Sequence, residues 1–600
     1  MTPSPTSSLL APDQAALYDA AAGGWLHFQQ PRKILVAQRL EEVVPLLRRL
    51  EELTARHGWA AAGWLSYEAA PACDPALPVQ PDPSGFPLAW FLLCEPPAAM
   101  SAPGASCAIP FSWSPSIEDQ AYLAGVARIK ELISRGDSYQ VNYTYRLRAP
   151  LAPAHEHNLL ALLRQEPPFY GGLISSRDWL ISSGSPELFF TRQGRQLISR
   201  PMKGTAPRGR DAAEDQELAA GLRASLKNRA ENVMIVDMVR NDLGRIARPG
   251  SVRVKELFAL ERYPTLFQLT STVEAESRSS LAEIFQATFP PASITGAPKT
   301  RTMEIISELE PQPRRIYTGT MGFVLPDGRA QFNVAIRTLL VDRERREAEY
   351  GLGSGIVWDS DPEEELAECR TKARICTPPT PAFALLETML WTPGQGYSLL
   401  PEHLERLQRS AIYFDYPLDL AAIRAELQRL AASLGQRSRV RLLLHRDGRI
   451  GCSATEIAPL AADHQARVTL APTPIPAPDP WFVHKTTRRS FYEQARQACP
   501  DHDDVLLYNA RGELTESTIA NLLISMDNTL YTPPLSCGLL PGTARASLLA
   551  RGRIRERVLP RELLEQGHPL YLVNSVRGIY RARYCPEEGE RSDRVACRAE

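Results

Sequence analysis

The stretch GSGIVWDSDPEEELAEC, residues 353–369, joins closely spaced glycines to the start of an acidic helix. The glycines do not form the G-x-G-x-x-G pattern of a phosphate loop, so they indicate closely packed backbone. Asp361 followed by Pro362, with Glu364 three residues after the aspartate, supplies an N-cap, a proline at the first helical position and a capping-box acid. This stretch therefore predicts a helix that begins at residues 361–362.

A second acidic helix is predicted from AENVMIVDMVRND, residues 230–242, where Glu231 shares a face with apolar residues. An ionised carboxylate on such a face is costly unless it is paired or bound to a metal. On the first helix, Glu365, Glu368 and Lys372 share one side at three- and four-residue spacing. Carboxylates from two helices suit Mg²⁺, which prefers oxygen ligands. By themselves, these residues also fit exposed, salt-bridged helices.

Lysine is rare in this chain, because only eight of the 68 basic residues are lysines. They are Lys33, Lys130, Lys203, Lys227, Lys255, Lys299, Lys372 and Lys485. A lysine amine can lose its proton and attack carbon, which arginine cannot do. The rare lysines are therefore candidates for chemistry, although Lys33, Lys227 and Lys255 need no such role.

Several motifs occur in a fixed order between residues 136 and 373, and together they resemble the chorismate-utilising family. They are GDSYQVN (136–142), SPELF (185–189), RPMKGT (200–205), AENVMIVDMVRND (230–242), SITGAPKTRTMEII (293–306), IRT (336–338) and GSGIVWDSDPEEELAEC (353–369). The resemblance implies an α/β fold built on a β-sandwich, with chorismate and Mg²⁺ in a central cleft. It implies Glu231 and Glu368 as Mg²⁺ ligands. The substrate-binding positions that it implies are Thr295, Gly296, Ala297, Arg337, Gly353 and Lys372.

RPMKGT is the motif that distinguishes members of this family. Anthranilate synthases usually carry alanine where Lys203 stands, whereas aminodeoxychorismate synthases carry lysine. The resemblance implies that the Lys203 amine attacks chorismate C2, with Glu187 as the acid for the departing C4 hydroxyl. Anthranilate synthases also have a histidine pair in the segment matching TLFQLTS (265–271), where this chain has Phe267 and Gln268. These differences predict amination without pyruvate elimination.

The last third of the chain contains a single lysine, Lys485, and a pyridoxal-phosphate enzyme needs one lysine for its Schiff base. HLERL, HKTTRRSFYEQAR, GELTESTIANLLI, LLPGTAR (539–545) and LVNSVRG (572–578) resemble the fold-type IV pyridoxal-phosphate family, which includes aminotransferases and aminodeoxychorismate lyases. The resemblance implies Lys485 as the Schiff-base lysine and Glu516 as the partner of the pyridine nitrogen. It implies that Arg406, Gly542 and Thr543 bind the phosphate.

The predicted fold class is a multidomain α+β or α/β chain. A chorismate-utilising β-sandwich with helices precedes a fold-type IV domain. The predicted segments are an N-terminal part (1–115), a catalytic domain (116–375), a proline-rich linker (376–382), the fold-type IV domain (383–581) and a polar tail (582–600). The fold-type IV domain is short at its start, because the linker arrives almost directly before Leu386-Glu387-Thr388. Residues of the preceding domain are expected to supply the missing edge.

Composition excludes several functional classes. The formal net charge of −1 gives no argument for nucleic acid or an anionic membrane, and no apolar run is long enough to span a bilayer. Ten scattered cysteines without C-x-x-C pairs, and an N-terminus without signal-peptide features, predict a cytoplasmic protein. No cysteine lies in a glutaminase G-x-C-x-G elbow, so ammonia is expected from solution or from a separate glutamine amidotransferase subunit (component II).

Together, the motifs of the two domains predict the synthesis of 4-aminobenzoate for folate biosynthesis. The first domain aminates chorismate to 4-amino-4-deoxychorismate, and the second eliminates pyruvate with pyridoxal 5′-phosphate. The alternative is an anthranilate synthase component I fused to an aminotransferase-like or inactive fold-type IV module.

Overall fold

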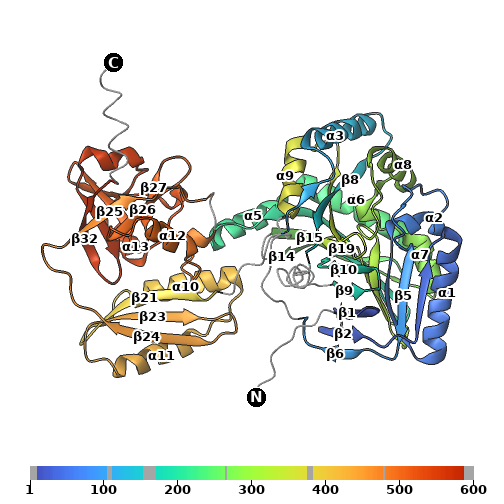
Figure 1. Cartoon of the computed structure of the whole chain (residues 1–600), viewed down its shortest axis with the longest axis horizontal. Helices are drawn as coiled ribbons and strands as arrows, with labels where there is room; N and C mark the ends of the chain where they lie inside the picture. Colours follow the sequence, from blue (N-terminus) through green and yellow to red (C-terminus); the bar gives the residue numbers. More distant parts are fainter. Residues whose placement is uncertain are drawn as a thin grey trace. The chain divides into compact units, whose positions relative to one another are not determined.

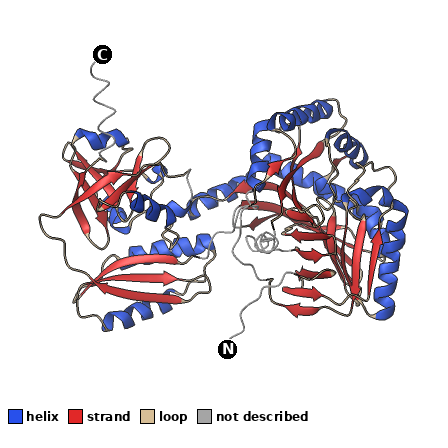
Figure 2. Ribbon diagram, viewed as in Figure 1, coloured by secondary structure: helices blue, strands red, loops and turns tan. Residues whose placement is uncertain are grey.

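The structure, a computed structural model, describes residues 10–103, 111–152, 170–263, 266–373, 383–476 and 480–586. The chain divides into two units, one of residues 1–207 and 219–380 and the other of residues 208–218 and 381–600. The linker predicted at 376–382 lies outside the described residues. Figures 1 and 2 show the elements of each unit.

Two sheets, in which all the described strand pairs are antiparallel, form the first unit within the described residues (Figure 2). The first sheet runs in the order β16 (Gly296–Ala297), β8 (Gln140–Pro150), β20 (Glu347–Ile356), β19 (Thr338–Asp342), β10 (Trp179–Ser183), β9 (Gly172–Ser175), β1 (Gln14–Asp19), β2 (Gly24–Phe28) and β6 (Ala98–Met100), with β7 (Ser114–Pro115) on β8. The second runs in the order β13 (Met202–Pro207), β15 (Leu266–Glu276), β12 (Gln196–Arg200), β11 (Leu188–Gln193), β18 (Ala330–Asn333), β17 (Thr320–Val324), β4 (Ala60–Leu65), β5 (Ala89–Cys94) and β3 (Lys33–Ala37), with β14 (Arg253–Arg262) on β15.

Helices cover both sheets of this unit. The helices α1 (Leu40–His57), α6 (Leu226–Gly244) and α7 (Leu281–Thr288) share one apolar core with the second sheet, and α3 (Asp119–Ser134), α8 (Lys299–Leu309) and α9 (Pro362–Ala373) share another with the first. A third core joins strands of both sheets, with Phe28, Trp64 and Phe323 fully buried in it. Strands from residues 1–115 pair with later strands, since β1 pairs with β9 and β4 with β17. The N-terminal part is thus built into the same sandwich.

Tyr139, Val141, Tyr143 and Tyr145 alternate in the sequence with a period of two and predict a strand. That strand is present as β8, which begins one residue after Tyr139. Val141, Tyr143 and Tyr145 belong to the apolar core shared with α3, and Tyr122 of α3 stacks on Tyr143 at 5.2 Å between ring centroids. The residues between them are polar and buried, beginning with Gln140. This strand therefore carries an apolar face toward the helices and a polar face toward the opposite side.

In the sequence, Pro326, Asp327 and Gly328 predict a hairpin turn, followed by a strand in which Phe332, Val334, Ile336 and Thr338 alternate. The hairpin is confirmed as β17 and β18, which pair antiparallel. The strand after this turn ends at Asn333, however, so the alternation expected as far as Thr338 is wrong. The helix start predicted at 361–362 is also confirmed. One oxygen of Asp361 accepts hydrogen bonds from the N–H groups of Glu363 and Glu364, both at 3.0 Å.

The second unit contains two sheets within the described residues. A small sheet has the order β22 (Gly396–Tyr397), β21 (Leu385–Thr392), β23 (Ser438–Leu444) and β24 (Ile450–Glu456), and packs on α10 (Leu400–Phe414) and α11 (Leu420–Ala432). The other has the order β27 (Leu514–Ser517), β26 (Asp504–Tyr508), β25 (Gln465–Leu470), β32 (Gly578–Tyr584), β31 (Leu570–Asn574), β28 (Asn521–Met526), β29 (Thr529–Thr532) and β30 (Arg555–Glu556). The helices α12 (Ser490–Ala498) and α13 (Thr543–Ala550) pack beside this sheet.

Two boundaries differ from those predicted from the sequence. The strand β32 continues to Tyr584, past the predicted domain end at 581, because its residues pair with β31 and β25. Residues 208–218, which include the start of α5 (Ala212–Ala224), belong to the second unit although they lie far earlier in the sequence. No helix in the described part of the chain is long and apolar enough to cross a bilayer.

Candidate active sites

Lys203 lies on β13 with its amine enclosed among charged groups. Burial lowers the pKa of the Lys203 ammonium below its ordinary value of 10.5, and the carboxylate of Glu231 opposes this effect. Gly355 leaves room for the amine, because a methyl group at this position would lie 2.6 Å from Lys203 Nζ and 3.0 Å from Gln140 Nε2. A lowered pKa increases the fraction of neutral amine, the nucleophilic form.

Glu187 precedes β11 and is 3 % exposed. Burial raises the pKa of this carboxyl group to about 7, opposed by a hydrogen bond with Ser293 and by the charge of Lys203. A carboxyl group with such a pKa carries its proton over much of the neutral range and can act as an acid there. The structure thus brings a candidate nucleophile and a candidate acid into electrostatic contact.

The two acidic helices supply the predicted metal ligands. Burial raises the pKa of Glu231 on α6, and the charge of Glu368 on α9 adds to the increase. Lys372 Nζ lies 2.8 Å from a carboxylate oxygen of Glu368 and donates to the carbonyl of Gly353, also at 2.8 Å. The ion pair lowers the pKa of Glu368. The two carboxylates are therefore close enough to influence each other's ionisation.

This pair fits Mg²⁺ by the chemistry of its donors. Both are carboxylates, and the unfavourable interaction between Glu231 and Glu368 would be relieved by a divalent cation. No cluster of three or more metal-ligating side chains occurs among the described residues. Mg²⁺ commonly keeps several waters and binds through one or two carboxylates plus its substrate, so two protein ligands suffice.

The predicted substrate-binding residues lie on neighbouring segments of the first unit. Gly296 and Ala297 form β16, which pairs with Val141 and Gln140 of β8, and Gly296 has φ 151°, a conformation that favours glycine. A methyl group on Gly296 would lie 1.9 Å from the carbonyl oxygen of Gln140. Close packing of backbone against β8 therefore explains this glycine.

Thr295, Arg337 and Gly353 complete this predicted set. Thr295 is fully buried. The guanidinium of Arg337 lies 5.2 Å from the centroid of the Tyr263 ring, and Arg337 itself has φ 48°. Gly353 lies on β20, where a methyl group would meet the Thr144 side chain at 2.5 Å.

Two residues of this site were not predicted from the sequence. Gln140 is fully buried, yet neither atom of its side-chain amide has a hydrogen-bond partner among the described residues. Its motif, GDSYQVN, was recognised, but only the structure shows the amide beside Lys203. Tyr317 is the other, because its pKa responds to the charge of Lys372 and a methyl group on Gly351 would lie 2.1 Å from its ring. Unpaired buried amide atoms indicate groups available to a ligand.

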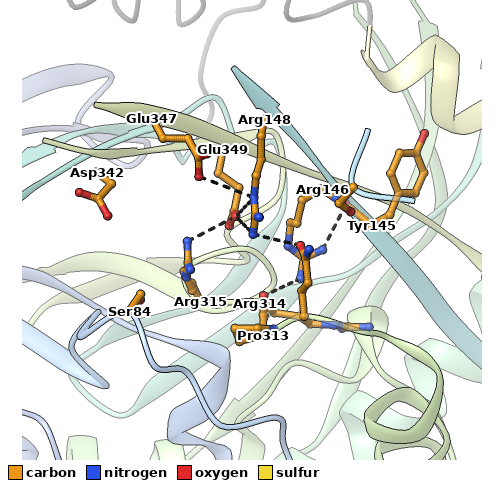
Figure 3. Close-up of polar contacts among 12 residues, drawn as sticks. Ser84, Tyr145, Arg146, Arg148, Pro313, Arg314, Arg315, Asp342, Glu347 and Glu349 are labelled. Carbon is orange, nitrogen blue, oxygen red and sulfur yellow. Dashed lines mark hydrogen bonds and ion pairs between the residues drawn. The ribbon is translucent and has the colours of Figure 1, made fainter. Parts of the chain in front are cut away.

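A group of ion pairs joins β8, β20 and the turn before Tyr317 (Figure 3). Arg148 Nη2 lies 3.0 Å from a carboxylate oxygen of Glu349, and Arg315 Nη1 lies 3.3 Å from the same oxygen. Arg146 is 1 % exposed and stacks over the Tyr317 ring at 5.0 Å from its centroid. These contacts hold the Tyr317 ring against the strand that carries Gly353.

In the second unit, Lys485 lies beside the small sheet, since its carbonyl accepts a hydrogen bond from the Leu386 N–H at 2.9 Å. Burial and the charges of Arg406 and Arg489 lower the pKa of the Lys485 amine to about 8. Glu516 on β27 influences this amine and is itself 4 % exposed. A lysine with this pKa is partly neutral near neutral pH, as carbonyl chemistry requires.

Glu516 is surrounded by hydrogen-bond donors. The Tyr492 hydroxyl donates to it at 2.8 Å, the Leu540 N–H at 3.1 Å and the Asn521 amide at 3.3 Å. Burial nevertheless raises the pKa of Glu516 to about 7. A protonated pyridine nitrogen beside this carboxylate would supply the missing positive charge.

Arg406 on α10 forms a buried network. Its guanidinium donates to both oxygens of Glu387 at 2.9 and 2.6 Å and to the Pro541 carbonyl at 3.0 Å. His403 Nδ1 lies 2.6 Å from Glu387 and its Nε2 lies 3.3 Å from the Thr543 hydroxyl. The pKa of Glu387 falls to about 2 because Arg406 and His403 outweigh its burial. Glu387 and His403 were not predicted as site residues, although LET (386–388) was recognised as a motif.

The predicted phosphate turn lies at the start of α13. Gly542 is the N-cap, and a methyl group on it would lie 1.9 Å from the Asn521 side-chain oxygen. Helix N-termini bind anions through their free N–H groups. An arginine, a helix N-terminus, an enclosed lysine and a buried glutamate are the groups that pyridoxal phosphate needs, so the residues present fit this cofactor.

Residues 100–378 match the family model described as chorismate binding enzyme, and residues 384–585 match that of amino-transferase class IV. The chain therefore joins a chorismate-binding domain to a class IV amino-transferase domain, a family that uses pyridoxal phosphate. In sequence, the first domain is similar to aminodeoxychorismate synthase component 1 of Bacillus subtilis (strain 168), with 40 % identity over 265 residues, 44 % of this chain and 56 % of the relative.

Anthranilate synthase component 1 of Streptomyces coelicolor is similar to the same degree, with 40 % identity over 288 residues, 46 % of this chain and 56 % of the relative. The chain thus spans about half the length of these curated relatives. A putative 2,3-dihydroxybenzoate-specific isochorismate synthase from Bacillus anthracis shares the fold, with a TM-score of 0.51, 20 % identity and coverage of 61 % of this chain and 96 % of that one. These findings confirm the predicted fold class.

Proposed function

We propose that this chain converts chorismate to 4-aminobenzoate in two steps. The first domain replaces the C4 hydroxyl of chorismate with an amino group, and the second releases pyruvate from 4-amino-4-deoxychorismate. The observation that carries the proposal is the enclosed Lys203 amine, whose pKa is lowered, beside Glu187, whose pKa is raised to about 7.

In the first step, the neutral Lys203 amine forms a bond to C2 of chorismate as the C4 hydroxyl leaves. Glu187 donates its proton to that hydroxyl, so that water is the leaving group. Ammonia then adds at C4 and displaces the lysine from C2. Mg²⁺, held by Glu231 and Glu368, would offset the negative charge of the substrate carboxylates. Lys372 adds a positive charge in the same region.

The presence of lysine at position 203 favours amination at C4 over anthranilate formation. Both kinds of synthase are similar to this domain to the same extent, so overall similarity does not separate them. A covalent amine is needed only for the C4 product. Phe267 and Gln268 stand where anthranilate synthases have histidines, and this supports a product that retains its enolpyruvyl group.

In the second step, pyridoxal phosphate would supply an electron sink for removal of the C4 proton. Lys485 takes this proton, for which a pKa of about 8 is suitable. Glu516 keeps the pyridine nitrogen protonated, while Arg406, Gly542 and Thr543 bind the phosphate. The second domain thereby consumes the product of the first, and this relation supports both assignments.

The proposal includes chorismate and ammonia as substrates. A separate glutamine amidotransferase subunit, component II, would supply the ammonia. The pathway in which the product serves is folate synthesis, and the proposed location is the cytoplasm.

Product analysis tests the proposal. The purified chain is incubated with chorismate, ammonium, Mg²⁺ and pyridoxal phosphate, and the products are identified by mass spectrometry. We expect 4-aminobenzoate and pyruvate from the wild type, and 4-amino-4-deoxychorismate alone from Lys485→Ala. Lys255→Ala, at an exposed position on β14, is the matched control and should resemble the wild type. Anthranilate as product would refute the role of Lys203, and an unchanged Lys485→Ala would refute the second step.

A further inference from the structure

Residues 208–218 lie between Lys203 and Glu231 in the sequence, yet they belong to the unit that contains Lys485. The segment is folded on itself by a buried ion pair. The Arg208 guanidinium binds both oxygens of Asp215, with the shortest contact at 2.6 Å, and the Gly209 N–H donates to the same carboxylate at 2.7 Å. The side chains of Arg208 and Asp215 are only 6 % and 8 % exposed. This segment therefore has a defined shape of its own.

Backbone carbonyls of the segment bind two aromatic side chains of the class IV domain. The Tyr413 hydroxyl donates to the Gly209 carbonyl at 2.7 Å, and His484 Nε2 lies 3.1 Å from the Arg210 carbonyl oxygen. The Arg208 guanidinium donates to the Tyr413 carbonyl at 3.0 Å and lies 4.8 Å from the centroid of its ring. The rings of Tyr413 and His484 stack with centroids 4.4 Å apart.

The hydrogen bonds of His484 have a fixed direction. Burial lowers the pKa of the His484 imidazole to about 4, so the ring is neutral near neutral pH. A carbonyl oxygen can only accept, so Nε2 carries the proton and donates it to Arg210. Nδ1 is then the acceptor, and the Ser410 hydroxyl at 2.9 Å is its donor. The ring is therefore held from both sides in one tautomer and one orientation.

The contacts of His484 and Tyr413 lie directly beside Lys485 and Arg406, the proposed cofactor-binding residues. His484 is the neighbour of Lys485 in the chain. Arg406, Ser410 and Tyr413 recur at helical spacing along α10, so the side of the helix that carries the arginine also carries the two contacts to this region. Glu387, the partner of Arg406, follows the residue whose N–H binds the Lys485 carbonyl.

We propose that residues 208–218 are a positioning element of the class IV active site, and that the Arg210 carbonyl, through His484, fixes the backbone from which Lys485 extends. His484 and Asp215 are positioning residues in this account, since His484 acts through the Lys485 backbone and Asp215 acts through the fold of the segment. The inference rests on the assignment of Lys485 as the cofactor lysine. It gives a reason why the class IV domain is short at its start, because an element from the preceding part of the chain completes it.

Two substitutions of His484 separate positioning from simple packing. The amide nitrogen of glutamine can replace Nε2 as donor to Arg210, whereas asparagine reaches only the position of Nδ1. The readouts, in the full chain, are the dissociation constant of pyridoxal phosphate from its absorbance and the pKa of Lys485 in the cofactor-free protein. The latter is obtained from the pH dependence of acetic anhydride labelling, measured by peptide mass spectrometry.

We expect His484→Asn to weaken cofactor binding about tenfold and to change the Lys485 pKa, because a buried hydrogen bond is lost. We expect His484→Gln to keep both the dissociation constant and the Lys485 pKa at their wild-type values, because the glutamine amide can donate to Arg210. Asp215→Ala, which opens the segment without touching His484, should reproduce the effect of His484→Asn. Arg210→Ala is the control, since only the backbone carbonyl of Arg210 is used and its side chain is paired with Glu214 near the surface.

Amination of chorismate and the melting temperature are measured for each variant, so that a folding defect is recognised. If His484→Asn does not fold, Asp215→Ala and Arg210→Ala still decide the matter. Cofactor binding and Lys485 pKa values that stay unchanged in Asp215→Ala, or that change equally in Arg210→Ala, overturn the proposal. A Lys485 that does not bind pyridoxal phosphate in the wild type would instead refute its assignment as the cofactor lysine.

Discussion

Gly355→Ala is the substitution that most directly tests the position of the Lys203 amine. The new methyl group would lie 2.6 Å from Lys203 Nζ, whereas an ordinary contact begins at 3.4 Å, so the amine must retreat by at least about 0.8 Å. The amine is the end of a flexible side chain and can move without disturbing β20. Misplacing a reacting group by about 1 Å can reduce a rate about a hundredfold, and this is the loss that we expect for amination.

The assay follows chorismate consumption with ammonium and Mg²⁺, and the melting temperature reports the fold. Formation of 4-aminobenzoate from supplied 4-amino-4-deoxychorismate should not change, because that step uses the other domain. Gly221→Ala in α5 is the matched control, since a methyl group there meets no atom within 4 Å. An unchanged amination rate in Gly355→Ala would show that the amine need not occupy this position, and the reasoning about Lys203 would fail.

Three further predictions follow from the charges of the two sites. Amination should decline as the pH rises through about 7, because the Glu187 carboxyl group, with its raised pKa, keeps its proton only below that value. Glu187→Gln should lower the rate about 10²- to 10⁴-fold and abolish this decline. A decline that persists in Glu187→Gln would assign the pH dependence to another group. Arg406→Ala should destabilise the class IV domain by about 3–5 kcal/mol, because it leaves the buried Glu387 without its cationic partner. Calorimetry measures this loss, and Arg409→Ala, at an exposed position on the same helix, should change the unfolding transition little. Equal effects of the two substitutions would contradict the ion-pair argument. Removing Mg²⁺ with a chelator should stop amination but should not stop the formation of 4-aminobenzoate from supplied 4-amino-4-deoxychorismate. Glu231→Gln should raise the Mg²⁺ concentration needed for the half-maximal amination rate. An unaltered Mg²⁺ requirement in Glu231→Gln would contradict the assignment of Glu231 as a ligand.

The sequence by itself determined the order of the two domains and the elements that carry short-range signals. The helix at 361–362 was predictable because an N-cap and a proline act within one turn, and β8 because its apolar residues alternate along one strand. The fold class followed from motifs in a fixed order, and both family models match the corresponding regions. Lys203 and Lys485 were identified as candidates because the remaining lysines of an arginine-rich chain are few. Their roles stay predictions until the experiments above are done.

Only the tertiary structure decided which distant residues share an environment. Glu187 and Glu231 both affect the pKa of Lys203 because strands and a helix far apart in the sequence converge, and no spacing rule reports that convergence. The unpaired amide of Gln140 is visible only once every neighbour is placed. Likewise, the polar segment at 208–218 carries no sequence signal of its destination. Its place beside His484 depends on backbone carbonyls, which every residue possesses, and on a fold that brings together residues more than 200 positions apart.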